Sequence, residues 1–262
     1  MGEIIELTKG LTRRYLLPCN EGYLLVEGGS ESEFSLFLKE LNEEGIGPGE
    51  IKYLFLSHHH EDHAGFASSL RELSDCRIIA HQEALEPLEK GEHFIPGEGG
   101  IVNRRVILYG YYLFLTKKVR LKLKPLEIME GDLPVTGDDN EMLRTLGVPG
   151  KILVTPGHSP DSISLLLDDG SCFCGDLAMN GPAWLKTRNC CIFISDVEQY
   201  YKSWQKIIDQ GARTIYPAHG RPFSYRELEM NMHAFSEEDL IMKRPGQGKF
   251  RGSESTNKAV SK

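Results

Sequence analysis

The sequence has no long apolar run. A helix that crosses a bilayer needs about 20 consecutive apolar residues, and the longest run here, Val106 to Leu115, is interrupted by Gly110. The first six residues, Met-Gly-Glu-Ile-Ile-Glu, include two acids and no apolar stretch of the secretory type. We therefore predict a cytoplasmic protein with no membrane partner.

An excess of positive charge is also missing. The 262 residues include 38 acidic and 30 basic side chains, which give a formal net charge of −8. This balance provides no general electrostatic attraction to nucleic acid, so we expect no nucleic-acid partner. The length is sufficient for one large domain with a substantial core.

The cysteines do not follow a metal-binding or redox pattern. None of the six belongs to a Cys-x-x-Cys pair, and their spacing is irregular. In a chain without secretory features, such cysteines are typically reduced and buried. We assign no chemistry to Cys19, Cys76, Cys172, Cys174, Cys190 and Cys191.

Strand and helix patterns occur in the first half of the chain. Two short strands are predicted at 15–19 and 23–27, and a continuous apolar strand, of the kind buried on both faces, at 51–57. Ser30 and Glu33 have the spacing of a helix capping box ahead of an amphipathic helix. A helix from about Ala64 to Leu73 and a strand from Arg77 to Ala80 complete this set.

The second half repeats the order of the first. Strands are predicted at 151–155, 162–167, 171–174 and 213–216, and Asp196 can cap a helix after the third. Two such sets predict an α/β (α+β) protein in which two sheets pack face to face with helices outside. We expect one domain over residues 1–244, an insertion at about 91–130, and a disordered tail at 245–262.

Histidines and an aspartate crowd the end of the strand at 51–57. His58 and His60 are two residues apart, so in an extended chain both side chains point the same way. Asp62 and His63 follow at the start of the next predicted helix. Imidazole and carboxylate are the usual ligands of zinc and non-haem iron. A surface polyhistidine patch is the alternative interpretation of this stretch taken alone.

Three further potential ligands each follow a predicted strand. His158 comes after the strand at 151–155, and Asp176 comes after the strand at 171–174. His219, in Pro-Ala-His-Gly, comes after the strand at 213–216. A single loop histidine is more often structural than a ligand, but four strand ends that all offer ligands favour a metal site.

The order of these motifs resembles the metallo-β-lactamase superfamily over roughly residues 10–235. The shared pattern is His-x-His-x-Asp-His, then a Gly-His loop, a Gly-Asp turn and a late Ala-His-Gly. The resemblance implies a four-layer αβ/βα sandwich of two mixed sheets, with two metals in a cleft at one edge. It assigns His58, His60 and His158 to the first metal, Asp62, His63 and His219 to the second, and Asp176 to both, while His59 and Glu61 occupy variable positions.

The resemblance implies hydrolysis. Two divalent ions about 3.5 to 4 Å apart can hold a water as hydroxide and polarise a substrate oxygen, and Asp62 would be the catalytic residue that orients this nucleophile. Zinc is the metal we expect, with iron or manganese as alternatives. The small-molecule substrate is expected to be an ester, thioester or lactone. The alternatives are a phosphodiesterase, an iron-dependent oxidoreductase of the persulfide dioxygenase or flavodiiron type, and a binding protein with a vestigial site.

Residues that contact the substrate are harder to predict. Lys186 and Arg188 lie in the loop after Asp176 and could bind a substrate anion, although solvated surface charge is the competing interpretation. The aromatic residues of the 91–130 insertion could form a wall over the metals. They could equally belong to a small satellite core or to the contact of a homodimer.

Overall fold

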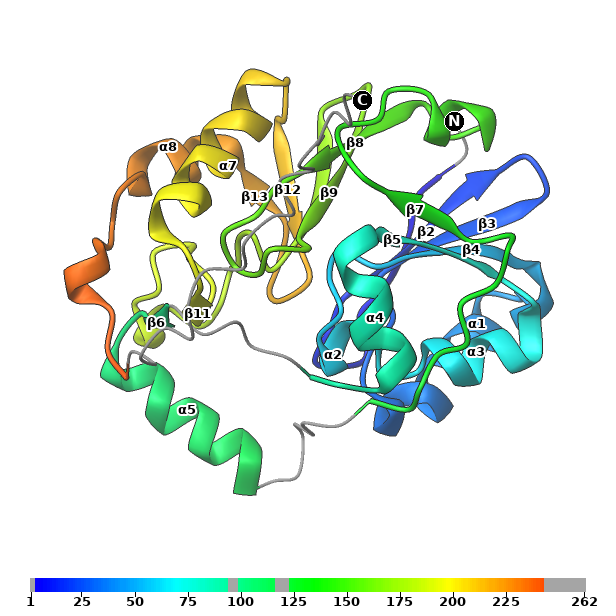
Figure 1. Cartoon of the computed structure of the whole chain (residues 1–262), viewed down its shortest axis with the longest axis horizontal. Coiled ribbons are helices and arrows are strands. Elements are labelled where there is room, and N and C mark those ends of the chain that lie inside the picture. Colours follow the sequence, from blue (N-terminus) through cyan, green and yellow to red (C-terminus); the bar gives the residue numbers. More distant parts are fainter. Residues whose placement is uncertain (1–2, 94–98, 116–122, 243–262) are drawn as a thin grey trace, which may run out of the picture.

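Two β-sheets lie face to face at the centre of the molecule (Figure 1). The computed structural model describes residues 3–93, 99–115 and 123–242. The six-stranded sheet has the order β1 (Ile5–Leu7), β2 (Arg14–Cys19), β3 (Gly22–Val26), β4 (Ile51–Phe55), β5 (Arg77–His81) and β7 (Leu133–Val135). The five-stranded sheet has the order β13 (Phe223–Ser224), β12 (Thr214–Pro217), β10 (Ser171–Gly175), β9 (Ile163–Leu167) and β8 (Gly150–Val154). A third ladder pairs β6 (Gly100–Ile101) with β11 (Phe193–Ile194).

Helices cover the outer face of each large sheet (Figure 1). On the six-stranded sheet these are α1 (Phe34–Glu43), α3 (Ala67–Ser74) and α4 (Gln82–Lys90), and on the five-stranded sheet α7 (Val197–Asp209) and α8 (Tyr225–Asn231). Shorter helices are α2 (Glu61–Ala64), α6 (Met142–Thr145) and the 3-10 turns η1 (Glu31–Glu33), η2 (Pro48–Glu50), η3 (Ala183–Leu185) and η4 (Glu237–Asp239). Both sheets contain parallel and antiparallel pairs. The predicted sandwich of two mixed sheets with outer helices is confirmed.

Alternation along the strands builds a separate core between each pair of layers. In β2, Tyr15 and Leu17 face the opposite sheet, whereas Leu16 packs under the helices. In β10, Phe173 faces the other sheet, and its neighbour Cys172 packs under α7. Since successive strand residues point to opposite faces, strands with apolar residues on both faces can fill the inter-sheet core and an outer core together.

Two local predictions in the first half need correction. The helix expected from Ala64 to Leu73 is two helices, α2 and α3, and the first begins at Glu61, inside the histidine-rich stretch. The capping box at Ser30 and Glu33 does not form. The Ser30 hydroxyl donates to Glu61 Oε2, and the Glu33 carboxylate binds the buried Arg14 guanidinium, so tertiary partners outcompete the local cap.

The region expected to be an insertion contains β6 and the helix α5 (Arg104–Leu115), which projects from the body of the molecule (Figure 1). Tyr109 packs edge-on against Trp184, with ring centroids 5.9 Å apart, whereas Tyr111 and Tyr112 are exposed.

Most of the basic run at 117–124, and the tail expected at 245–262, lie outside the described residues. None of the described helices has the length and apolar character needed to cross a bilayer.

Candidate metal centre

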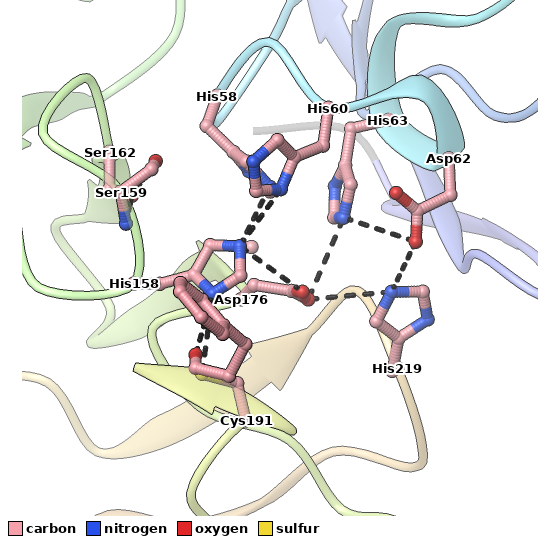
Figure 2. Close-up of polar contacts among 12 residues, drawn as sticks. His58, His60, Asp62, His63, His158, Ser159, Ser162, Asp176, Cys191 and His219 are labelled. Atoms are coloured by element: carbon pink, nitrogen blue, oxygen red, sulfur yellow. Dashed lines mark hydrogen bonds and ion pairs between the residues drawn. The ribbon is translucent and has the colours of Figure 1, made fainter. Parts of the chain in front are cut away.

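The ends of several parallel strands meet at one edge of the sandwich. In the first sheet β3 and β4 are parallel, and β4 leads directly into the histidine-rich stretch. In the second sheet β10 and β12 are parallel, and β8 runs in the same direction because it is antiparallel to β9, which is antiparallel to β10. Residues that follow these strands therefore share one edge. The predicted ligands from both sheets come together there (Figure 2).

Three histidines form the first group of ligand atoms. His58 Nε2 lies 2.9 Å from His60 Nδ1, and His158 Nε2 lies 3.2 Å and 3.0 Å from those two atoms. All three side chains are buried. Tetrahedral zinc with bonds of 2.0–2.1 Å would place its nitrogen ligands about 3.3 Å apart. The three nitrogens are thus arranged as a ready set of ligands for one divalent ion.

Asp62, His63 and His219 form the second group. Asp62 Oδ2 lies 3.2 Å from His219 Nε2 and 3.9 Å from His63 Nε2. Asp176 stands between the groups: its Oδ1 lies 3.6 Å from His63 Nε2 and 3.4 Å from His219 Nε2, whereas its Oδ2 lies 3.7 Å from His158 Nε2 (Figure 2). One carboxylate can therefore reach both groups.

The outer nitrogens of three histidines fix which ring atom is free to bind a metal. His158 Nδ1 lies 3.0 Å from the carbonyl oxygen of Phe193, and His219 Nδ1 lies 3.1 Å from that of Leu11. His63 Nδ1 lies 3.1 Å from the Glu27 carboxylate. Carbonyl and carboxylate oxygens only accept, so each Nδ1 carries a proton, and each Nε2 is the nitrogen that faces the centre and can bind a metal once it carries no proton.

Charges differ between the two groups. Burial, together with the neighbouring histidines, lowers the pKa of His58 and His60 well below the ordinary value, so both rings are neutral. In the second group burial opposes the charged form of His219, but Asp176 and Asp62 outweigh it and raise its pKa to about 9. For His63, burial is likewise outweighed, and Glu27, Asp62 and Asp176 raise its pKa well above the ordinary value.

Unpaired buried atoms at this edge test whether the residues fit a metal. Among the described residues, His63 Nε2 and Asp176 Oδ1 are buried and have no hydrogen-bond partner. An unsatisfied buried polar atom costs roughly 1–3 kcal/mol, more when it is charged. A divalent cation held by the second group would satisfy both atoms, so the donor set fits divalent metal binding.

Other predicted residues lie apart from this cluster, and sequence reasoning missed several that support it. Lys186 and Arg188 are both exposed, with left-handed backbone angles, and no described contact joins either side chain to a candidate ligand.

Glu27 was missed by sequence reasoning although it follows β3, and the ends of such strands supply the candidate ligands. His59 pairs with the buried Asp161 at 2.8 Å, and His93 packs against His60. These long-range contacts leave no local pattern in the sequence.

Comparisons with known proteins agree with this geometry. The chain is 24% identical over 240 residues to the Beta-lactamase-like protein 2 homolog of Drosophila melanogaster, an alignment that covers 88% of this chain and 67% of that protein. It is 23% identical over 164 residues to the hydroxyacylglutathione hydrolase of Rhodopseudomonas palustris (strain BisB5). That alignment covers 59% of this chain and 47% of the relative, so the chain spans about half of that enzyme.

Solved structures and the family pattern complete the comparison. A metallo-beta-lactamase family protein from Thermus thermophilus superposes with a TM-score of 0.60 at 22% sequence identity, and the match covers 88% of this chain and 77% of that one. The sequence pattern of the metallo-beta-lactamase superfamily matches residues 15–219, which include every candidate ligand described above. The chain therefore belongs to the metallo-beta-lactamase superfamily and is a metal-dependent hydrolase.

Proposed function

We propose that this hydrolase uses two divalent ions, with zinc in both positions, to cleave an ester, thioester or lactone bond of a small molecule. The observation that carries the proposal is the position of Asp176, whose two oxygens face the two ligand groups separately. When bound, the ions supply Lewis-acid polarisation of the substrate and lower the pKa of water. His58, His60 and His158 would hold the first ion, and Asp62, His63 and His219 the second, with Asp176 shared.

Asp62 is the residue we propose to orient the attacking water. Its side chain is one-quarter exposed, and only its Oδ2 contacts His219 and His63 among the described residues. Burial opposes ionisation of Asp62, yet the charges of His63 and His219 hold its pKa well below the ordinary value. A carboxylate that stays ionised accepts a hydrogen bond from water, so Asp62 can align water for attack.

A thioester is the substrate we favour within this class. The support is the similarity to a hydroxyacylglutathione hydrolase, whose name denotes a thioester of glutathione. Lys186 and Arg188, exposed on the loop that follows Asp176, are the proposed contacts for the negative charge of such a substrate. We propose that the protein acts in the cytoplasm.

The first test is metal content and its link to activity. Untagged protein, purified without added metal or chelator, is expected to contain about two zinc ions per chain. Stripped protein should lose activity on a neutral ester, a hydroxyacylglutathione thioester and a lactone, and regain it when zinc returns. Asp62→Asn should abolish turnover, whereas His233→Asn, at a histidine outside the site, should leave turnover unchanged.

Other outcomes identify the alternatives. Turnover of a phosphodiester alone would replace the acyl substrate with a phosphoester. One iron per chain, together with oxygen consumption on sulfur substrates, would indicate an oxidoreductase. A protein that retains no metal and binds none on titration would contradict the proposal as a whole.

A further inference from the structure

His93 is a histidine beside the metal ligands that the ligand set does not include. It follows α4, where Gly91 ends the helix in a left-handed conformation, and its side chain is half-buried. Its ring centroid lies 4.6 Å from that of His60, with the planes tilted by 36°. His93 also lies within electrostatic range of Asp62 and His158, which belong to different ligand groups. It is therefore a neighbour of the whole centre.

A backbone contact fixes the role of each nitrogen of this ring. The N–H of Glu61 donates to His93 Nδ1 at a distance of 3.3 Å. An amide N–H cannot accept, so Nδ1 is the acceptor and the ring proton sits on Nε2. Nε2 carries a proton in the neutral ring and in the charged ring alike, so its capacity to donate does not depend on pH.

Within the described part of the chain, no hydrogen bond uses the donor on Nε2. The one hydrogen bond of this ring among the described residues is at Nδ1, and Nε2 is not one of the fully buried unpaired atoms. A histidine that served only as packing for His60 would need neither the aligned Nδ1 nor an accessible N–H. The ring is held from one side by Glu61 and supported on its face by His60, which is the arrangement of a preorganised donor.

We propose that His93 Nε2–H donates a hydrogen bond to an oxygen of the bound substrate on the His60 side of the metal centre. The oxygen is the acyl oxygen that gains negative charge as the bond is attacked. A donor already fixed in place stabilises this charge without reorganising, so its contribution is largest in the transition state. This inference rests on the proposed acyl hydrolysis and adds a substrate-binding residue to it.

Two substitutions separate the hydrogen bond from the packing. His93→Phe keeps a ring against His60 but removes the donor, whereas His93→Gln keeps an N–H donor without the ring. With phenyl thioacetate as substrate, we expect His93→Phe to lower kcat by roughly 10- to 100-fold, with little change in KM. His93→Gln should stay within about threefold of wild type, and both variants should keep the wild-type metal content.

A binding measurement provides a readout without turnover. Phenyl methylphosphonate carries a tetrahedral anion in place of the attacked acyl group, and calorimetry should show weaker binding to His93→Phe by the same roughly 10- to 100-fold, with His93→Gln near wild type. Wild-type kcat in His93→Phe would overturn the proposal, as would equal losses in both variants accompanied by loss of metal. A wild-type protein that does not hydrolyse the thioester would instead contradict the proposed function. Phosphonate binding would still test the role of His93 separately.

Discussion

A buried carboxylate behind His63 sets how this histidine can bind a metal. Glu27 Oε2 accepts from His63 Nδ1, so Nε2 is the nitrogen that faces the centre, and the negative charge makes it a stronger electron-pair donor to a cation once its proton has left. Glu27 itself has a left-handed backbone, with φ of 65°. A non-glycine residue in this conformation is strained, which is consistent with a side chain that must reach one specific partner.

Glu27→Gln should therefore weaken the second metal position selectively. The amide can still accept from His63 but removes the charge, and changes behind metal ligands typically cost 10- to 100-fold in affinity. We expect competitive chelator titration to show roughly a 10-fold weaker second ion and an unchanged first ion. Glu86→Gln, at an exposed glutamate paired only with Lys90 among the described residues, is the control. Equal weakening of both ions would show that Glu27 holds the fold rather than the ligand.

Lys186 and Arg188 can be tested by comparing charged and neutral substrates. An exposed cation attracts an anion only weakly in water, so Lys186→Ala and Arg188→Ala should each raise KM about two- to fivefold for a hydroxyacylglutathione. KM for a neutral ester should not change. Lys202→Ala, on the exposed side of α7, controls for net charge. If KM for the anionic thioester is also unchanged, these two residues are surface charges.

At the scale of elements, the two sheets come into close contact beside the candidate metal ligands. Gly175 ends β10 with φ of 53°, and a Cβ placed on it would lie 2.1 Å from Oγ of Ser57, two residues after β4. Ser57 in turn lies 3.0 Å from His58 Nδ1. The glycine thus allows the strand that delivers Asp176 to approach the strand that delivers the histidines.

Gly175→Ala should force these strand ends apart. Overpacking of a buried contact typically costs 1–3 kcal/mol, and the left-handed φ adds to the cost. We expect a stability loss of about 2–4 kcal/mol in urea unfolding, together with loss of at least one metal. Gly110→Ala is the matched control with the opposite sign: nothing lies within 4 Å of its Cβ, and it sits inside α5. That variant should gain up to about 1 kcal/mol. A Gly175→Ala protein as stable as wild type would show that the sheets can relax.

The sequence determines the strands more fully than it determines side-chain contacts between residues far apart in the chain. Strands that are mostly apolar, such as β4 and β10, can be predicted because side chains buried on both faces leave a nearly continuous pattern. The cap expected at Ser30 fails because its hydroxyl finds Glu61, 31 residues away. Local spacing predicts what a residue can do with its neighbours, but it carries no information on distant partners, and His93 escaped notice for that reason.

At the scale of the whole molecule, the fold gathers charges of both signs at one edge. In the metal-free protein His219, with its pKa raised to about 9, and His63 are protonated at neutral pH and face Asp62 and Asp176. A raised pKa stabilises the fold fully below the unfolded value of about 6.5, and this stabilisation is lost as pH rises through about 9. His58 and His60 act oppositely: because burial lowers their pKa values, the unfolded chain binds protons more readily than the folded one, and the fold loses stability as pH falls below about 6.5.

The same charges make the two metal positions respond differently to pH. A metal ligand must be deprotonated, so an ion that enters the second group displaces protons from His63 and His219, whereas His58 and His60 are already neutral. Calorimetric zinc titrations at about pH 6.5, 7.5 and 8.5, each in two buffers of different ionisation enthalpy, would count the protons. We expect about two released with the second ion at about pH 7.5 and almost none with the first. Second-site affinity should rise roughly 10-fold per pH unit for each displaced proton, and the contribution of His219 should level off above about pH 9. Equal proton release in both steps would mean that the two ligand groups do not differ in charge, and the division between them would have to be redrawn.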